Sequence, residues 1–329
     1  MSHSKNLMIA ISAVQAACKV CQSIRSSDAC EDAISKKDRS PVTIADFGSQ
    51  AVIIQRLLEN DSDLKMVAEE DANQMQSLKD TSLGTDMVNA VAEVVPGATW
   101  EKIARWVSCG AYEGSATEAF WTLDPIDGTK GFLRNQQYAV ALGLIENGEP
   151  VLGVLGCPNY PVDGFESKGG AIGRLFFAEK GKGAWTLPLS VSINDLASAQ
   201  PVRVSPIESA VDAKLCESVE SGHSSHDDSA KLTQALGITK ESLRIDSQCK
   251  YAAVANGDAS IYLRFPTSAE YREKIWDHAA GVIVNMEAGG KVTDIHGNAL
   301  DFSLGQKLEK NQGIIAASAS IHDSVVAAI

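Results

Sequence analysis

The sequence predicts a protein of the α+β or α/β class, built from helices and short strands in two parts. Two stretches with helical periodicity open the chain, and short β-like runs separated by glycine and proline begin at Phe120. Strands and helices alternate after residue 201. At about 150 residues per domain, a chain of 329 residues has room for two domains. We therefore expect an N-terminal α+β lobe over residues 1–187 and a C-terminal α/β lobe over residues 188–329.

The composition limits the partners that this protein can bind. Apolar residues make up 44% of the chain and charged residues 22%, which is typical of a folded globular protein. Acidic residues outnumber basic ones by 42 to 29, and the net charge of −13 repels polyanions. This charge argues against binding to a nucleic acid polymer or an anionic membrane. Seven scattered cysteines are typical of reduced thiols, and we expect Cys18 and Cys21 to be buried structural thiols.

The first helix is predicted from about Leu7 to Ile24, where apolar residues recur at helical spacing. Ser12, Gln15 and Lys19 interrupt this apolar run, which favours an amphipathic core helix over a signal peptide or a membrane span. We therefore expect no membrane association and a cytoplasmic location.

A second helix is predicted after residue 43, and a strand over residues 66–68 then ends in acidic residues. The apolar positions of the helix recur at spacings of three and four: Ile44, Phe47, Ala51, Ile54, Leu57 and Leu58. Residues 72–118 are polar, with helical periodicity over residues 100–107, and we interpret them as a surface insertion.

Short apolar runs predict the strands of the first part over residues 120–123, 138–146, 151–155 and 175–178. Asn147-Gly148 is a strong hairpin signal, and glycines at 181 and 183 predict another turn. The alternating elements of the second part are expected as strands near 215–219, 259–265 and 291–293 and helices near 228–236, 248–255 and 277–288.

The most informative segment follows the strand at residue 120 and reads Asp124-Pro125-Ile126-Asp127-Gly128-Thr129. The proline ends the strand and the glycine permits a tight turn, so that Asp124 and Asp127 converge with the Ile126 carbonyl between them. Three hard oxygen ligands in one turn suit Mg²⁺. Gly128 and Thr129 would present backbone N–H groups to a phosphate at the start of the following helix.

Two further acidic sites lie far away in the sequence, at Glu69-Glu70 and at Asp277 in Trp276-Asp277-His278-Ala279-Ala280-Gly281. With the Asp-Pro-Ile-Asp-Gly-Thr turn, these motifs resemble those of the lithium-sensitive, magnesium-dependent phosphomonoesterases, which include inositol monophosphatases and fructose bisphosphatases. The resemblance implies a layered αβαβα sandwich, with two sheets in two lobes and the active site between them.

The same resemblance implies the roles of individual residues. Two or three Mg²⁺ ions would be held by Glu69, Asp124, Asp127, Asp277 and the carbonyl of Ile126. Asp46 matches the catalytic carboxylate of that superfamily, and Thr129 matches its hydroxyl partner.

A second set of segments, over residues 218–227, 246–251, 261–264 and 271–274, resembles the 3'(2'),5'-bisphosphate nucleotidases of the eukaryotic type. The resemblance implies hydrolysis of the 3'-phosphate of adenosine 3',5'-bisphosphate, and of its 5'-phosphosulfate form, with inhibition by Li⁺ and Na⁺. It also implies a monomer. The residues implied to bind the substrate are Gly128, Thr129, His223, Ser247, Lys250, Arg264 and Asp277.

Electrostatics supports this assignment independently. Two carboxylates ~4 Å apart at an effective dielectric constant near 20 repel each other by about 4 kcal/mol, so five in one pocket need cations to stay ionised. Lys250 and Arg264 would supply the local positive charge that a phosphorylated substrate needs in an acidic protein.

Other functions also fit parts of the sequence. An inositol mono- or bisphosphate phosphatase would use the same metal site, and an HD-type metal phosphohydrolase would be built on His223, His226 and Asp227. A nucleotide-binding sensor without catalysis is a third alternative. Asn135-Gln136 stands where the relatives often carry two glycines, and we expect this bulk to narrow the rim of the site.

Overall fold

The computed structural model describes residues 4–26, 40–167, 169–219, 226–266, 268 and 270–329. Two long helices, α1 (Lys5–Arg25) and α3 (Ser40–Leu58), pack against each other at the start of the chain. The Ser4 side chain caps α1 by accepting a hydrogen bond from the Leu7 backbone N–H at 3.2 Å. Both predicted helices are confirmed, and Cys18 and Cys21 of α1 are buried free thiols as expected.

Helix α1 is the one helix of the described chain that is long and apolar enough to span a membrane by composition. It lies instead against α3 and the large sheet, with 61% of its most apolar window buried inside the protein. The same test is passed by core helices of proteins that enter no membrane.

The described residues form a large sheet of seven strands in the order β1 to β7. The strands are β1 (Met66–Ala68), β2 (Phe120–Asp127), β3 (Ala139–Glu146), β4 (Glu149–Pro161), β5 (Ile172–Glu179), β6 (Ala184–Pro188) and β7 (Gln200–Pro201). Strand β1 is parallel to β2, and the other neighbours are antiparallel. Asn147 and Gly148, both at positive φ, form the predicted β3–β4 hairpin turn. Because β7 pairs with β6, this sheet extends past residue 187 to residue 201.

Residues 72–118 are not the surface insertion that the sequence predicts. They form α4 (Ala72–Met75), the 3-10 helix η1 (Gln76–Leu78), α5 (Ser82–Val94) and α6 (Trp100–Ser108). Helices α5 and α6 pack on α3 and bury Met87, Val91, Ile103 and Val107 in the core. The polar residues of this segment cover one face of each helix, while the apolar face meets α3.

The second sheet has five strands in the described residues, in the order β11-β12-β10-β8-β9. The strands are β8 (Leu215–Glu217), β9 (Leu243–Arg244), β10 (Ile261–Arg264), β11 (Gly290–Thr293) and β12 (Ile314–Ser318). Its helices are α8 (His226–Ala235), α9 (Cys249–Ala255), α10 (Ala279–Glu287) and α11 (Ala319–Ala327). The remaining short helices are α7 (Thr129–Leu133), η2 (Ile193–Ser198), η3 (Ala210–Asp212) and η5 (Ile275–Asp277). The sequence patterns predict no element after residue 293, so β12 and α11 are elements that the sequence analysis missed.

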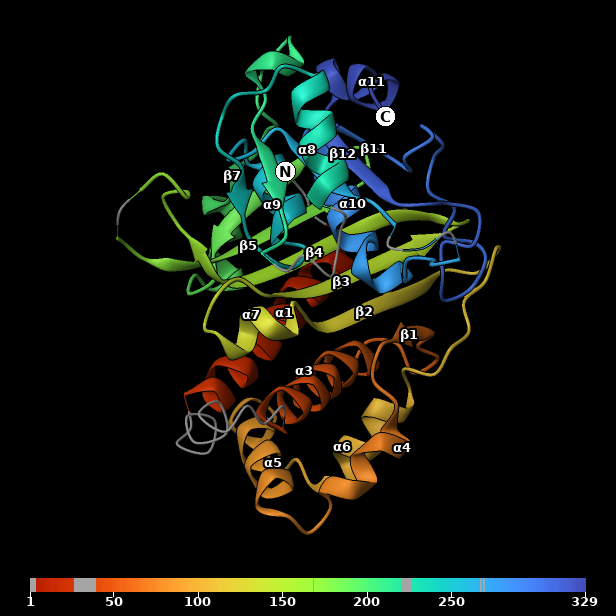
Figure 1. Ribbon diagram of the computed structural model, residues 1–329. Helices are drawn as coiled ribbons and strands as arrows, with labels where there is room; N and C mark the ends of the chain where they lie inside the picture. Colours follow the sequence, from red (N-terminus) through yellow and green to blue (C-terminus); the bar gives the residue numbers. More distant parts are fainter. Residues whose placement is uncertain (1–3, 27–39, 168, 220–225, 267, 269) are drawn as a thin grey trace.

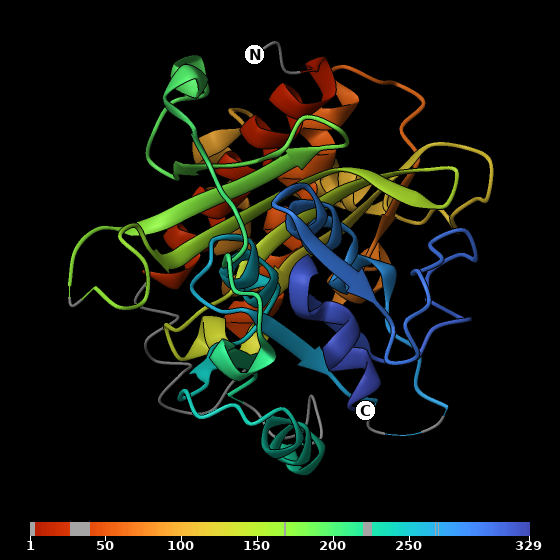
Figure 2. The ribbon, with the colours of Figure 1, turned by 90° about the horizontal axis from the view of Figure 1, so that it is seen from above.

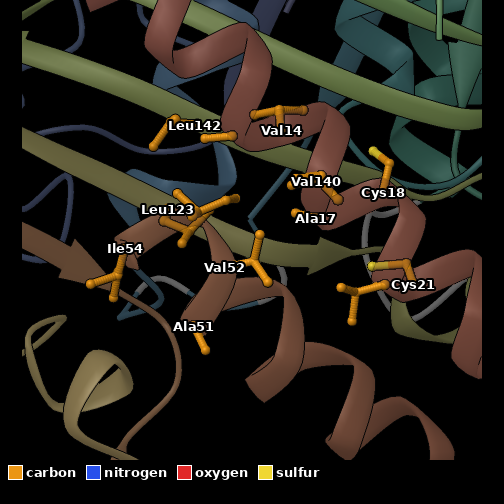
Figure 3. Close-up of a cluster of buried hydrophobic side chains, with 14 of the residues drawn as sticks. Val14, Ala17, Cys18, Cys21, Ala51, Val52, Ile54, Leu123, Val140 and Leu142 are labelled. Carbon is orange, nitrogen blue, oxygen red and sulfur yellow. The ribbon is translucent and has the colours of Figure 1, made fainter. Parts of the chain in front are cut away.

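The helices and sheets are arranged in layers (Figure 1). Alternating side chains on the strands of the large sheet face different layers. Val140 and Leu142 of β3 face α1 and α3, whereas Ala139 and Ala141 face α9 and α10. Figure 3 shows the first of these cores, with Val14 and Ala17 of α1 near strand residues. A third core lies between the small sheet and the outer helices α8 and α11. The order of layers is therefore helix, sheet, helix, sheet, helix.

The middle helical layer joins the two sheets and brings α10 close to the large sheet. A Cβ on Gly153 of β4 would lie 2.5 Å from Ile283 Cγ2 and 2.6 Å from the Ala280 carbonyl oxygen, so only glycine permits this approach. Seen from above in Figure 2, the C-terminal elements in blue lie over the long strands in yellow and green. This packing brings η5, which immediately precedes α10, against strands β2 and β3.

Candidate active site

The end of β2 forms the predicted acidic turn. The Asp124 side chain, only 2% exposed, accepts a hydrogen bond from the Ile126 backbone N–H at 3.1 Å. The pairing of β2 with β3 shifts between Asp124 and Asp127, which marks an irregularity at this point of the ladder. Gly128 follows at φ +91°, and a Cβ there would lie 2.8 Å from Ser247 Cβ. Both the backbone angle and the close approach therefore require glycine.

The second acidic group lies at the end of β1, which pairs with β2 and so delivers Glu69 and Glu70 beside Asp124. Helix α3 is fixed to both strands by two side chains. Ser49 Oγ donates to the Pro125 carbonyl at 3.1 Å, and Gln50 Nε2 donates to the Glu70 carbonyl at 2.8 Å.

Asp46 lies one helical turn before Ser49 and Gln50, on the same face of α3. Its side chain is buried at 7% exposure and lies near the carboxylates of Glu69 and Glu70.

A cavity of about 370 Å³ brings together Glu69, which follows β1, and residues from β2, α7, α9, β10 and η5. Of the predicted site residues, those that line it are Glu69, Asp124, Ile126, Asp127, Gly128, Thr129, Ser247, Lys250, Arg264 and Asp277. Chain segments more than 200 residues apart in sequence thus meet at one place, as the resemblance implies. A volume of this size is typical of a small-molecule site.

The carboxylates of the site destabilise one another's charged form. Loss of bulk water and the Asp277 and Glu70 carboxylates raise the pKa of Glu69 to about 8, although its side chain remains accessible from the cavity. Burial raises the pKa of Glu70 to about 7. Burial, with Glu69 and Asp127 nearby, raises the pKa of Asp124 well above its usual range.

Burial and neighbouring carboxylates also raise the pKa values of Asp127 and Asp46. Burial and then Asp277 raise the pKa of Asp127 to about 6, which the cationic side chains of Lys250 and Arg264 partly offset. Burial, followed by the charges of Glu70 and Glu69, raises the pKa of Asp46 well above its ordinary value. The carboxylates of the site therefore need nearby cations to stay ionised together.

The cation-rich wall of the cavity begins at Ser247, which stands at φ +69° just before α9. This left-handed backbone directs the next N–H, that of Gln248, to Asp127 Oδ2 at 2.5 Å. Lys250 is 4% exposed, and its amine lies 5.2 Å from the centre of the Tyr262 ring. Burial lowers the pKa of Lys250, and Asp127 opposes this effect.

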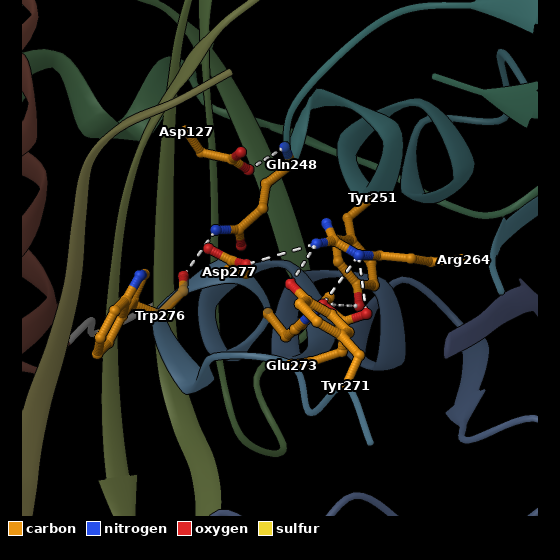
Figure 4. A network of polar contacts seen from close by, with 9 residues as sticks. Asp127, Gln248, Tyr251, Arg264, Tyr271, Glu273, Trp276 and Asp277 are labelled. Atoms are coloured by element: carbon orange, nitrogen blue, oxygen red, sulfur yellow. Dashed lines mark hydrogen bonds and ion pairs between the residues drawn. The ribbon is translucent and has the colours of Figure 1, made fainter. Parts of the chain in front are cut away.

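Arg264, at the end of β10, is the second cation of this wall. Its Nε lies 2.9 Å from both carboxylate oxygens of Glu273, and its Nη2 lies 3.7 Å from Asp277 Oδ2 (Figure 4). Burial alone would lower the pKa of Arg264, but the Glu273 and Asp277 charges raise it above its ordinary value. Glu273, Asp277 and His278 place ligand atoms within 4.8 Å of one another, but Glu273 and His278 are already paired with each other.

Asp46 is the described member of the predicted site that is not among the residues lining the cavity, although the charges of Glu70 and Glu69 act on it. His223 falls outside the described residues, as do the side chains of His226 and Asp227, so the HD-type alternative stays a hypothesis.

Neither Asn135 nor Gln136 is among the residues that line the cavity, and the expected narrowing of its rim stays a prediction. Asn135 stands at φ +55°, a conformation that glycine adopts readily and asparagine tolerates. The Gln136 side chain accepts a hydrogen bond from Arg134 Nε at 2.7 Å.

Sequence reasoning missed several polar residues that organise the site. Gln248 connects three of its segments, because its backbone N–H binds Asp127, its Nε2 donates to the Trp276 carbonyl at 2.8 Å, and its Oε1 accepts from the Gly281 N–H at 3.0 Å. Asp246 accepts from Arg134 at 2.7 Å. A glutamine directly before an apolar helical run is the signal for this role that the sequence offers.

The residues present fit a divalent metal. Hard oxygen donors from three segments converge on one cavity, where burial and their mutual repulsion raise the pKa of Glu69, Asp124 and Asp127, so that a bound cation would stabilise their charged form. The donors that could hold such ions are Glu69, Asp124, Asp127, Asp277 and the Ile126 carbonyl.

Comparisons with known proteins agree with this geometry. Residues 3–329 match the profile of the Inositol monophosphatase family. A protein of Emericella nidulans named 3'(2'),5'-bisphosphate nucleotidase is 42% identical, over 100% of this chain and 98% of the relative. A Dictyostelium discoideum protein of the same name is also 42% identical, over 96% and 94%.

Solved structures show the same fold, which confirms the predicted layered sandwich. An inositol monophosphatase from Anabaena superposes with a TM-score of 0.62 at 24% identity, over 98% of this chain and 94% of the other. CysQ from Bacteroides thetaiotaomicron, a bacterial member of the inositol monophosphatase family, gives 0.62 at 21% identity, over 95% and 97%. With the profile match over nearly the whole length and relatives at 42% identity, this chain belongs to the inositol monophosphatase family.

Proposed function

We propose that this protein is a Mg²⁺-dependent phosphomonoesterase that hydrolyses the 3'-phosphate of adenosine 3',5'-bisphosphate to AMP and phosphate. The proposal extends to the 5'-phosphosulfate form of this nucleotide and to inhibition by Li⁺ and Na⁺. Two curated relatives with the name 3'(2'),5'-bisphosphate nucleotidase, each 42% identical over nearly the full length, support it.

The observation that carries the proposal is that two groups of opposite charge line one cavity. The carboxylates of Glu69, Asp124, Asp127 and Asp277 form the group that we call the carboxylate wall, and the cations Lys250 and Arg264 belong to the cation-rich wall. A substrate with one phosphate that reacts and a second that is only bound matches this division. A substrate with one phosphate would make no use of the second anion-binding position that Lys250 and Arg264 offer.

Mg²⁺ bound by the carboxylates would supply positive charge to the phosphate and acidify a water molecule. In that state Asp46 and the Thr129 hydroxyl orient the water for in-line attack on phosphorus, and the Asp46 carboxylate takes its proton. The bond between phosphorus and the sugar 3'-oxygen breaks, that oxygen takes up a proton from solvent water as it leaves, and Asp46 returns the proton that it took to the solvent. Ser247, Lys250 and Arg264 hold the phosphate that does not react, while Gly128 and Thr129 face the one that does. We propose that Asp277 and His223 also bind the substrate. The role of His223 rests on the resemblance alone.

The second candidate is a phosphatase of inositol mono- or bisphosphates, which would use the same carboxylates. The family assignment and the Anabaena structure keep this activity in consideration. The two functions differ in their need for the cationic wall, because an inositol monophosphate has no second phosphate for Lys250 and Arg264.

The test is a phosphate-release assay with purified protein on adenosine 3',5'-bisphosphate, 3'-AMP, 5'-AMP and inositol phosphates, each with Mg²⁺, with chelator, and with Mg²⁺ plus Li⁺. We expect release from the bisphosphate only with Mg²⁺, with 5'-AMP as the product, and inhibition by Li⁺. Abundant release in chelator, or faster release from inositol phosphates than from the nucleotide, would overturn the proposal.

A further inference from the structure

Arg264 is held by a chain of buried polar side chains that reaches from the cavity into the middle helical layer (Figure 4). Glu273 is 2% exposed and places both carboxylate oxygens 2.9 Å from Arg264 Nε. On its other side, Glu273 Oε2 lies 3.2 Å from His278 Nε2. The ring of His278 is fully buried, and its Nδ1 lies 2.9 Å from the Tyr251 hydroxyl.

The direction of these hydrogen bonds follows from the chemistry of the groups. A carboxylate only accepts hydrogen bonds, so His278 Nε2 carries a proton and donates a hydrogen bond to Glu273. The second ring nitrogen, Nδ1, forms the hydrogen bond with the Tyr251 hydroxyl. All partners are satisfied in this arrangement, and each member is fixed from two sides.

Arg264 has two acidic neighbours that compete for it. Glu273 holds Nε at 2.9 Å, while Asp277, on the carboxylate wall, lies 3.7 Å from Nη2. The Tyr271 hydroxyl also lies 3.3 Å from Nη2. None of these contacts uses Nη1. Glu273 therefore holds the guanidinium away from the carboxylate wall and leaves part of its donor edge for a ligand.

We propose that Glu273 is a positioning residue that sets the preference of the site for substrates with a second, non-reacting phosphate, by fixing Arg264 through the Glu273–His278–Tyr251 chain. This inference rests on the proposed function. Without the Glu273 charge, Arg264 moves toward Asp277, and the phosphate loses an oriented cation. Preorganisation of a charged group reduces the cost of ordering it on binding, so the effect falls on affinity for the second phosphate.

The test is the variant Glu273→Gln, which keeps the size of the side chain and removes its charge. We expect kcat/KM for adenosine 3',5'-bisphosphate to fall at least about tenfold, mainly through KM, since hydrogen bonds to charged groups carry much of such binding. For 3'-AMP, which lacks the second phosphate, the fall is at least fivefold smaller. Glu273→Asp restores part of the loss if its carboxylate still reaches Arg264.

A double-mutant cycle separates positioning from a general structural role. In an Arg264→Ala background, adding Glu273→Gln should change kcat/KM for the bisphosphate less than about twofold, because the residue on which it acts is already gone. Asp258→Asn is the matched control: Asp258 accepts hydrogen bonds from Tyr160 at 2.6 Å and Asn256 at 2.7 Å in a network outside the cavity. This control should keep the substrate preference of the wild type.

The outcomes test the role of Glu273 and the proposed function separately. Equal losses on both substrates, or additive losses in the Arg264→Ala background, would overturn the inference and leave the proposed function intact. If the wild type does not hydrolyse the bisphosphate, the proposed function fails, and titration with inorganic sulfate decides the inference. Binding of sulfate that weakens with Glu273→Gln supports it, and binding insensitive to that change overturns it.

Discussion

Replacement of Lys250 by methionine removes the buried amine of the cation-rich wall while it keeps the length of the side chain. The amine lies 5.2 Å from the centre of the Tyr262 ring, and the residue is 4% exposed. Methionine fills such a space with little strain and can keep the contact with the aromatic ring. The change therefore isolates the charge.

The expected magnitude follows from the position of this charge. Two unit charges 4 Å apart at an effective dielectric constant of 20 attract by about 4 kcal/mol, which is an upper bound for one contact with the non-reacting phosphate. Hydrogen bonds to charged groups contribute a net ~1.5–3 kcal/mol. At about 1.4 kcal/mol per tenfold change, kcat/KM for adenosine 3',5'-bisphosphate should fall by roughly 10- to 100-fold relative to that for 3'-AMP.

The assay measures phosphate release from both nucleotides with saturating Mg²⁺, and the ratio of the two kcat/KM values is the readout. Lys291→Met is the control, because Lys291 is an exposed residue of β11 that pairs with Asp323 at 2.7 Å. The reasoning is refuted if Lys250→Met lowers both kcat/KM values equally, or if the ratio does not change. A second readout follows from Asp127: the Lys250 charge lowers the pKa of that carboxyl, so the acid limb of the pH profile should move to higher pH in the variant.

The other predictions concern protons and backbone geometry. Because the pKa of Glu69 is raised to about 8, Mg²⁺ should bind more weakly as pH falls from about 8.5 to about 6, with proton release measured by calorimetry in two buffers; a constant affinity without proton release would contradict this. The unfolded chain ionises Glu69 near the ordinary value of 4.5, so the metal-free protein should lose thermal stability as pH rises through about 8, and Mg²⁺ should restore it. A melting temperature that rises over this range would show that the carboxylates do not repel one another. Gly128→Ala should lower both stability and phosphate release, because the added Cβ would lie 2.8 Å from Ser247 Cβ. Gly181→Ala, at a similar φ of +76° but with nothing within 4 Å of the added Cβ, should lower stability alone. Equal effects of the two variants on activity would show that the close approach of Gly128 to Ser247 does not matter for the site.

The acidic turn was predictable from sequence because its chemistry is local. Asp124, Asp127 and the Ile126 carbonyl lie within four consecutive residues, and a proline and a glycine fix the chain around them. The long amphipathic helices α1 and α3 were predictable for the same reason, since one apolar face repeats at helical spacing over several turns.

The meeting of Glu69, Asp127 and Asp277 was predicted only through the resemblance. No pattern in one sequence shows that β1 pairs with β2, or that α10 packs on glycines of β3 and β4 and brings Asp277 to the same edge. Spacing along the chain says nothing of such tertiary contacts.

The polar partners of the site could not be predicted for a further reason. Glu273 stands in the charged segment Tyr271-Arg272-Glu273-Lys274, which is typical of a solvated loop, yet it is buried against Arg264. Residues 72–118 gave the opposite error, because their polar faces are evident in the sequence while the partner of their apolar faces, α3, is not.

The most direct test of the whole account is a crystal structure with Mn²⁺ in place of Mg²⁺ and with AMP bound, examined by anomalous scattering. The account predicts anomalous peaks within bonding distance of Glu69, Asp124, Asp127 and Asp277, with the AMP phosphate on Lys250 and Arg264. Peaks bound elsewhere, or an AMP phosphate away from both cations, would contradict it.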